Sequence, residues 1–92
     1  MNSMKKKYLP VGSVVKIKQN TREVMIVGYR VQFENKEYDY CAVLHPYGVI
    51  DTKKIVFNQN DIEKVSFTGF INDDFTKLQD KLLESKKEEM NY

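Results

Sequence analysis

The fold is decided by residues 23–33, which read EVMIVGYRVQF. One face of this segment is apolar at every second position, the period of a β-strand, and comprises Met25, Val27, Tyr29, Val31 and Phe33. The other face begins apolar and turns polar after Gly28. A glycine at such a change predicts a bulge or a bend, with the first half of the strand covered on both sides. The segment therefore predicts a long strand in a small sheet that curls over itself.

Shorter runs with strand character lie on both sides of this segment, at residues 14–18, 38–45, 55–57 and 63–70. The second of these runs is apolar on both sides, which predicts a central position in the sheet. The last run predicts a strand with Val65 and Phe67 facing inward.

Turn-forming residues separate the strands. Polar residues at 19–22 and 34–37 favour turns because several of them hydrogen-bond their own backbone. Residues 45–48 read HPYG, which places proline second and glycine fourth and predicts a type I turn. Val49 and Ile50 predict the start of another extended segment.

The hydrophobic period changes at residue 72. Phe75, Leu78 and Leu82 are spaced three and four apart, which places them on one face of a helix over about residues 73–88. Asn72 or Asp73 is suited to cap its first turn. The sequence thus predicts an α+β fold: a small curled antiparallel sheet of five to six strands over about residues 13–70, SH3-like or a half-barrel, followed by one amphipathic helix.

Length and composition indicate a small domain in the cytoplasm. The 92 residues predict a single domain over residues 9–92, preceded by a flexible basic leader over residues 1–8. A net charge of +2 predicts no strong attraction for nucleic acid or a membrane surface. No apolar run approaches the roughly 18 residues of a membrane helix, and none follows the basic leader as it does in a signal peptide. The single cysteine, Cys41, excludes an intramolecular disulfide and fits a reducing compartment.

The residues that carry chemistry in enzymes are sparse in this chain. Cys41 and His45 are four positions apart on a predicted strand, roughly 13 Å by the rise per residue, which is too far for a catalytic pair. One histidine and one cysteine do not supply a four-ligand zinc site, and the four glycines are scattered singly rather than gathered in a phosphate-binding loop. The sequence therefore predicts no enzyme activity, no metal and no cofactor.

Nucleic-acid binding is the alternative that composition leaves open. Small curled sheets bind single strands through stacked aromatic residues in a basic groove. The chain holds six tyrosines, five phenylalanines and a run of three lysines at residues 5–7. Most of these aromatic residues occur at strand alternation, which indicates a core, and the lysines are balanced by acids.

Several short pieces of the chain form an ordered series. LPVGSVV at residues 9–15 is followed by EVMIVG at residues 23–28. Further pieces follow in order, namely YDY (38–40), LHPYG (44–48), FN (57–58), DIEKV (61–65) and FTGF (67–70). This series, over about residues 9–83, resembles a family of small uncharacterised proteins from Gram-positive bacteria, a domain of unknown function. The basic leader and the lysines of the predicted helix depart from the family pattern.

The resemblance implies a function, because genes of this family are linked to type VII secretion and LXG-type toxin loci. It implies a cytoplasmic protein-binding accessory, such as a chaperone, targeting factor or adaptor for a secreted toxin, or alternatively an immunity protein that neutralises the toxin. The partner is then the toxin or its export helper, bound at a strand edge, on the open face of the sheet or by the helix. Because aromatic side chains concentrate binding energy at interface centres, the candidate partner-binding residues are Tyr29, Tyr40, Tyr47 and Phe70.

Overall fold

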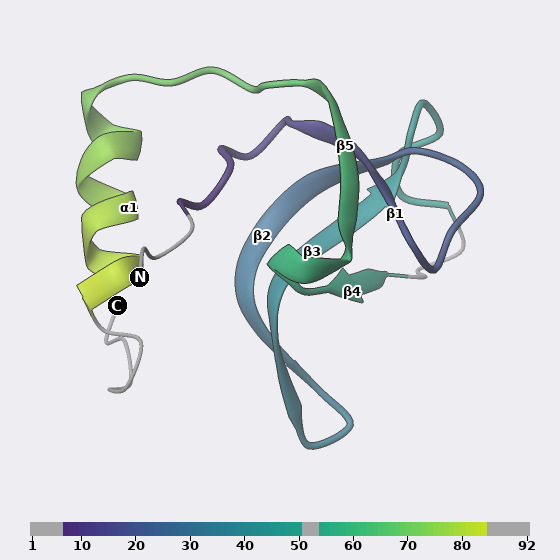
Figure 1. The fold of residues 1–92 in the computed structure, drawn as a ribbon. Coiled ribbons are helices and arrows are strands. Elements are labelled where there is room, and N and C mark those ends of the chain that lie inside the picture. Colours follow the sequence, from purple (N-terminus) through teal and green to yellow (C-terminus); the bar gives the residue numbers. More distant parts are fainter. Residues whose placement is uncertain (1–6, 51–53, 85–92) are drawn as a thin grey trace. The chain divides into compact units, whose positions relative to one another are not determined.

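The computed structural model describes residues 7–50 and 54–84. This part of the chain forms an antiparallel sheet followed by a helix, which confirms the predicted α+β fold (Figure 1). The strands are β1 (Val14–Ile17), β2 (Val24–Phe33), β3 (Lys36–Leu44), β4 (Ile55–Phe57) and β5 (Ile62–Phe67). A 3-10 turn, η1 (Gln59–Asp61), precedes β5, and the helix is α1 (Asp73–Glu84).

The chain divides into two compact units. Leu9–Phe70 contains the whole sheet, and the other unit comprises Met1–Tyr8 and Ile71–Tyr92, including α1. The predicted flexible leader and the predicted end of the helix fall mostly on residues 1–6 and 85–92, outside the described residues. Within the second unit, Tyr8 and Leu82 are both buried.

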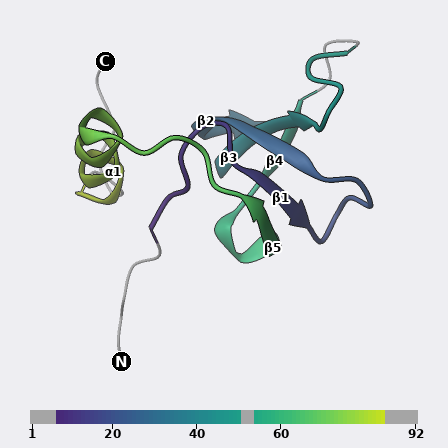
Figure 2. The ribbon, with the colours of Figure 1, turned by 90° about the horizontal axis from the view of Figure 1, so that it is seen from above.

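The sheet unit is curled, because its two edge strands are consecutive in the chain. The strand order is β4-β3-β2-β1-β5, and only residues 58–61 join the edge strands. In a flat sheet of five strands the edges are about 19 Å apart. A connection of this length that contains a 3-10 turn reaches roughly 13 Å. The sheet therefore bends to bring β5 back toward β4 and remains open between them, as a half-barrel does (Figure 2).

The long hairpin of β2 and β3 extends beyond the other strands (Figure 1). Its two-residue turn has Glu34 at φ 52° and Asn35 at φ 67°, the geometry of a type I′ turn, whose twist matches that of paired strands. The predicted bulge is present: Ile26 pairs with Ala42 and Gly28 with Cys41, which leaves Val27 as the extra residue.

This bulge corrects one prediction about β2. Met25 pairs with Val43, whereas Tyr29 pairs with Tyr40, and residues 40 and 43 of β3 point to opposite faces. The continuous apolar face predicted from Met25 to Phe33 is therefore wrong. The extra residue, Val27, is instead exposed.

The core of the sheet unit is built on β3, whose predicted central position is confirmed. Its residues 40–43 are all buried, so both faces of the strand are covered. The largest fully buried side chains of this unit come from four strands and are Tyr40, Phe57, Ile17, Ile26, Val15 and Val24.

The prediction that Val65 and Phe67 of β5 face inward is wrong, because Val65 is 43% exposed and Phe67 is 62% exposed. A register shift separates the pairing of Phe67 with Val14 from that of Val65 with Val15. Neighbouring residues of β1 point to opposite faces, so Val65 and Phe67 do too. Residues 45–48 turn the chain as predicted, and the amide of Gly48 donates to the carbonyl of Leu44 at 2.8 Å.

Candidate functional site

Two of the four predicted anchors lie together inside the sheet unit. Tyr29 and Tyr40 have ring centroids 5.9 Å apart, and Tyr40 stacks on Phe57 at 5.2 Å. Tyr40 is fully buried, so its ring offers no surface to a partner. It belongs to the core because β3 is central and covered on both faces.

A chain of hydrogen bonds ties these tyrosines to residue 9. The Tyr29 hydroxyl donates to the carbonyl of Leu9 at 2.7 Å, and the amide of Leu9 donates to Tyr40 Oη at 2.9 Å. Tyr40 Oη donates in turn to Gln59 Oε1 at 3.0 Å. Burial raises the pKa of Tyr29 to about 12, and a backbone hydrogen bond with Val11 opposes this effect. These contacts hold the segment before β1 and the turn η1 against β2 and β3. Their role is therefore to stabilise the fold.

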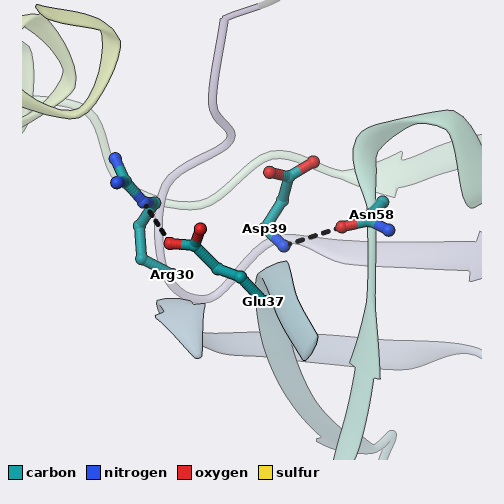
Figure 3. A network of polar contacts seen from close by, with 4 residues as sticks. All are labelled: Arg30, Glu37, Asp39 and Asn58. Carbon is teal, nitrogen blue, oxygen red and sulfur yellow. Dashed lines mark hydrogen bonds and ion pairs between the residues drawn. The ribbon is translucent and has the colours of Figure 1, made fainter. Parts of the chain in front are cut away.

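A second polar network fixes η1. The amide of Asp39 donates to Asn58 Oδ1 and the amide of Gln59 donates to Asp39 Oδ2, both at 2.9 Å. Asp61 Oδ2 accepts from the amide of Asn58 at 2.9 Å. The acids of this network thus accept from backbone amides of the turn. Figure 3 shows the bond between Asp39 and Asn58.

An ion pair lies on the neighbouring hairpin. Arg30 Nε and Glu37 Oε2 are 3.0 Å apart and join β2 to β3 (Figure 3). The Arg30 side chain is only 12% exposed, and its backbone has a positive φ of 53°. Both networks in Figure 3 consist of contacts within the sheet unit.

An open groove of about 900 Å³ lies on the sheet unit. Its volume is within the range of ligand pockets, about 300–1,000 Å³. Its walls come from the β1–β2 turn, the end of β2, the end of β3, the β3–β4 connection and β4. Six of the lining residues are aliphatic or phenylalanine: Val31, Phe33, Leu44, Ile50, Ile55 and Val56.

Part of this apolar lining is exposed to solvent. Phe33 is 49% exposed and Ile50 is 55% exposed. Exposed apolar side chains that gather in a hollow are typical of a surface that binds another molecule. We name this site the β2–β4 groove, defined by the six apolar residues above together with Arg22, Tyr47 and Lys54.

The β2–β4 groove contains one predicted anchor, Tyr47. Its ring is 50% exposed, and Arg22 Cζ lies 5.4 Å from the ring centroid. Arg22 Nη1 also donates to Tyr47 Oη at 3.2 Å. Arg22 and Lys54 are both exposed. The second remaining candidate, Phe70, is 78% exposed but does not line the groove.

Sequence reasoning missed the two cations of the groove. Arg22 lies in a polar turn after β1, and Lys54 lies in a connection thirty-two positions later. No local sequence pattern connects Arg22 with Lys54, because they line the same groove only through the pairing of β3 with β2 and β4. The signal that was present was Tyr47, an aromatic residue in a loop rather than in a strand.

The residues that carry chemistry do not converge. Cys41 is a buried free thiol whose pKa is raised by burial, with Lys54 acting in the opposite direction. The backbone amide of His45 donates to the carbonyl of Glu23 at 3.0 Å. In the described part of the chain, no three His, Cys, Asp or Glu side chains form a group suited to a metal ion. None of the helices described there is long and apolar enough to cross a membrane.

The fold and the groove define a small β-rich domain with a partly apolar groove on its sheet unit. The family model of DUF4176, a domain of unknown function, matches residues 8–78, and the chain belongs to this family. No curated protein and no solved structure matches the chain.

Proposed function

We propose that this chain is a non-enzymatic protein-binding accessory that acts in the cytoplasm. Its client is an LXG-type toxin exported by a type VII secretion system, or a helper protein of that export. It serves the client as a chaperone, targeting factor or adaptor. The resemblance described above supports the choice of client.

The β2–β4 groove supports protein binding and carries this proposal. An interface needs a desolvated apolar centre surrounded by polar residues. The groove offers apolar side chains from three strands and a loop, with Arg22, Lys54 and two amide side chains at its walls. A client segment that covers Phe33 and Ile50 removes apolar surface from water, which favours association.

Co-purification tests the proposal. The tagged chain is expressed with the toxin encoded beside it, or with the N-terminal export region or the C-terminal domain of that toxin, and is captured after nuclease treatment. We expect the export region to be retained at a fixed stoichiometry and the toxicity of the full toxin to be unchanged. Binding to the C-terminal domain with protection of the cell would instead make the chain an immunity protein.

Two phenylalanines provide a matched pair of variants for the groove. Phe33→Ser removes an exposed ring from the lining, and Phe70→Ser removes an exposed ring outside it. We expect Phe33→Ser to weaken capture at least tenfold, as loss of an interface anchor does, and Phe70→Ser to leave it within about twofold. The reverse result would move the contact face to the segment after β5.

A further inference from the structure

The charged side chains that line the β2–β4 groove in the described part of the chain are of one sign. Among these described lining residues, Arg22 and Lys54 are cationic and none is an aspartate or a glutamate. The other polar side chains are the neutral amides of Asn20 and Gln32. Neither cation forms an ion pair with an acid in the described part of the chain. The described lining of the groove thus presents positive charge beside apolar surface, and contains no acid that would neutralise this charge.

Arg22 is oriented before any ligand binds. Its guanidinium is held by the hydroxyl of Tyr47 at 3.2 Å and lies near the face of the same ring. One nitrogen is used for this bond, which leaves other N–H donors of the planar fork for a second acceptor. A carboxylate accepts two parallel bonds from such a fork. A guanidinium that is already positioned loses less conformational freedom when it binds.

The apolar part of the lining makes a free inorganic anion or a nucleic acid a poorer ligand for the groove than a protein segment. A free inorganic anion pairs with the cations but leaves Val31, Phe33 and Ile55 in water. A nucleic-acid backbone requires a track of cations, each of which releases counterions, and the described lining of the groove has two cations. A protein segment that carries apolar side chains and an acid satisfies both parts of the surface.

We infer that the β2–β4 groove binds an apolar segment of a partner protein that carries an aspartate or glutamate side chain, with that carboxylate on Arg22 and Lys54. This inference rests on the proposed protein-binding function and adds the chemistry of the recognised segment. The apolar side chains of the segment cover Phe33, Ile50 and Ile55, and Tyr47 holds Arg22 toward the carboxylate.

Selection from random peptides tests this chemistry without any toxin. A phage library of peptides of about twelve residues is selected on the full chain and counter-selected on a doubly substituted chain, Arg22→Gln with Lys54→Gln. We expect the enriched peptides to combine apolar residues with at least one aspartate or glutamate. Enrichment of basic or uniformly polar peptides, or no enrichment over the counter-selection, would overturn the inference.

Synthetic copies of the enriched peptides then report the role of each cation by fluorescence anisotropy. We expect Arg22→Gln and Lys54→Gln each to weaken binding about five- to tenfold, with a larger effect at low salt, because the contact is ionic. Replacing the acid of the peptide by its amide is expected to weaken binding by a similar factor. Lys64→Gln is the matched control, because Lys64 is an exposed lysine of β5 outside the groove, and it should change binding less than twofold.

Two further measurements assign the groove if the inference fails. A labelled oligothymidylate of about 20 nucleotides that binds the chain and loses affinity with Arg22→Gln would make the groove a nucleic-acid site. Self-association that the same substitution abolishes would assign the groove to a second copy of the chain.

Acid-bearing peptides that bind the groove while the toxin does not would keep this inference and reject the proposed client. A toxin that binds without regard to Arg22 and Lys54 would do the opposite.

Discussion

At the scale of single residues, Ser13 connects two segments that lie far apart in the sequence. Its side chain is fully buried, and its hydroxyl donates to the carbonyl of Pro10 at 2.7 Å. The same oxygen accepts from the amide of Gly69 at 2.9 Å. One side chain therefore joins the turn before β1 to the segment after β5.

Replacement of Ser13 by alanine tests this link. Ser13→Ala leaves the partly buried amide of Gly69 without its partner, and the carbonyl of Pro10 keeps only the bond from the Ser13 amide, so we expect a loss of about 1–3 kcal/mol in the free energy of unfolding. Urea denaturation followed by circular dichroism measures it. Thr68→Ala, at an exposed position one residue before Gly69, should stay within about 0.5 kcal/mol of the parent. Equal stability of both variants would show that the buried hydroxyl contributes nothing.

Gly69 itself is required by space rather than by backbone angle. A Cβ atom added there would collide with the carbonyl oxygen of Val11 and approach the backbone of Gly12 and Ser13. Gly69→Ala therefore forces two backbone segments apart, and we expect it to destabilise the chain by at least about 2 kcal/mol. Gly28→Ala is the control, because its added atom would meet Cys41 Cβ at an ordinary 3.7 Å. If thermal melting shows the two variants equally stable, the close approach at Gly69 is wrong.

The burial of Tyr29 makes the free energy of unfolding depend on pH in the alkaline range. Its pKa is raised by burial to about 12 in the folded chain, above the ordinary value near 10 of the unfolded chain. A raised pKa means that the folded state favours the neutral phenol, so this contribution is complete below pH 10 and is lost as the pH rises from 10 to 12.

The Tyr29→Phe variant isolates that contribution. We expect its free energy of unfolding to fall less steeply than that of the parent between pH 10 and 12, because the lysines titrate in both chains and cancel in the difference. Urea midpoints at several pH values measure the slopes. Parallel slopes would place the pKa of Tyr29 at its ordinary value.

At the scale of elements, η1 is held by side chains of its neighbours. The side-chain oxygen of Asn58 accepts from the backbone amide of Asp39 and so connects β3 to the turn. The backbone amide of Asn58 donates to the carboxylate of Asp61. We expect Asn58→Ala to cost about 1–2 kcal/mol and to speed hydrogen exchange at the amide of Asp39. Glu63→Ala, at an exposed site in β5, should do neither. Unchanged exchange at Asp39 in Asn58→Ala would contradict the cross-strand bond.

The elements also show how far sequence reasoning reaches. The strands, the central place of β3, the bulge near Gly28 and the start of α1 follow from local periodicity, and Asn72 caps the helix as expected, with its Oδ1 accepting from the amide of Phe75 at 2.9 Å. Periodicity does not survive a register shift, so the faces of Val27 and Phe67 were assigned wrongly. The groove could be predicted only through Tyr47, because its cations come from connections whose approach depends on the curl of the whole sheet.

At the scale of the whole molecule, the sheet unit contains what the proposed function needs. Among the described residues, every buried apolar side chain except Tyr8 and Leu82 lies within Leu9–Phe70. All residues that line the β2–β4 groove lie there as well. The helix is amphipathic and begins its first turn with Asp73 and Asp74, which suit the positive end of its dipole. No described residue of α1 lines the groove or belongs to the core of the sheet unit.

A chain that ends at Phe70 tests this division. We expect it to keep a cooperative unfolding transition, at lower stability because a shorter chain buries a smaller fraction of its surface. The acid-bearing peptides selected on the full chain should bind it within about twofold of their original affinity, since none of the described residues 71–84 lines the groove. Circular dichroism and fluorescence anisotropy measure the two properties separately. A truncated chain that folds but no longer binds the peptides would mean that the helix takes part in recognition. A truncated chain that fails to unfold cooperatively would mean that the sheet depends on the second unit for its stability.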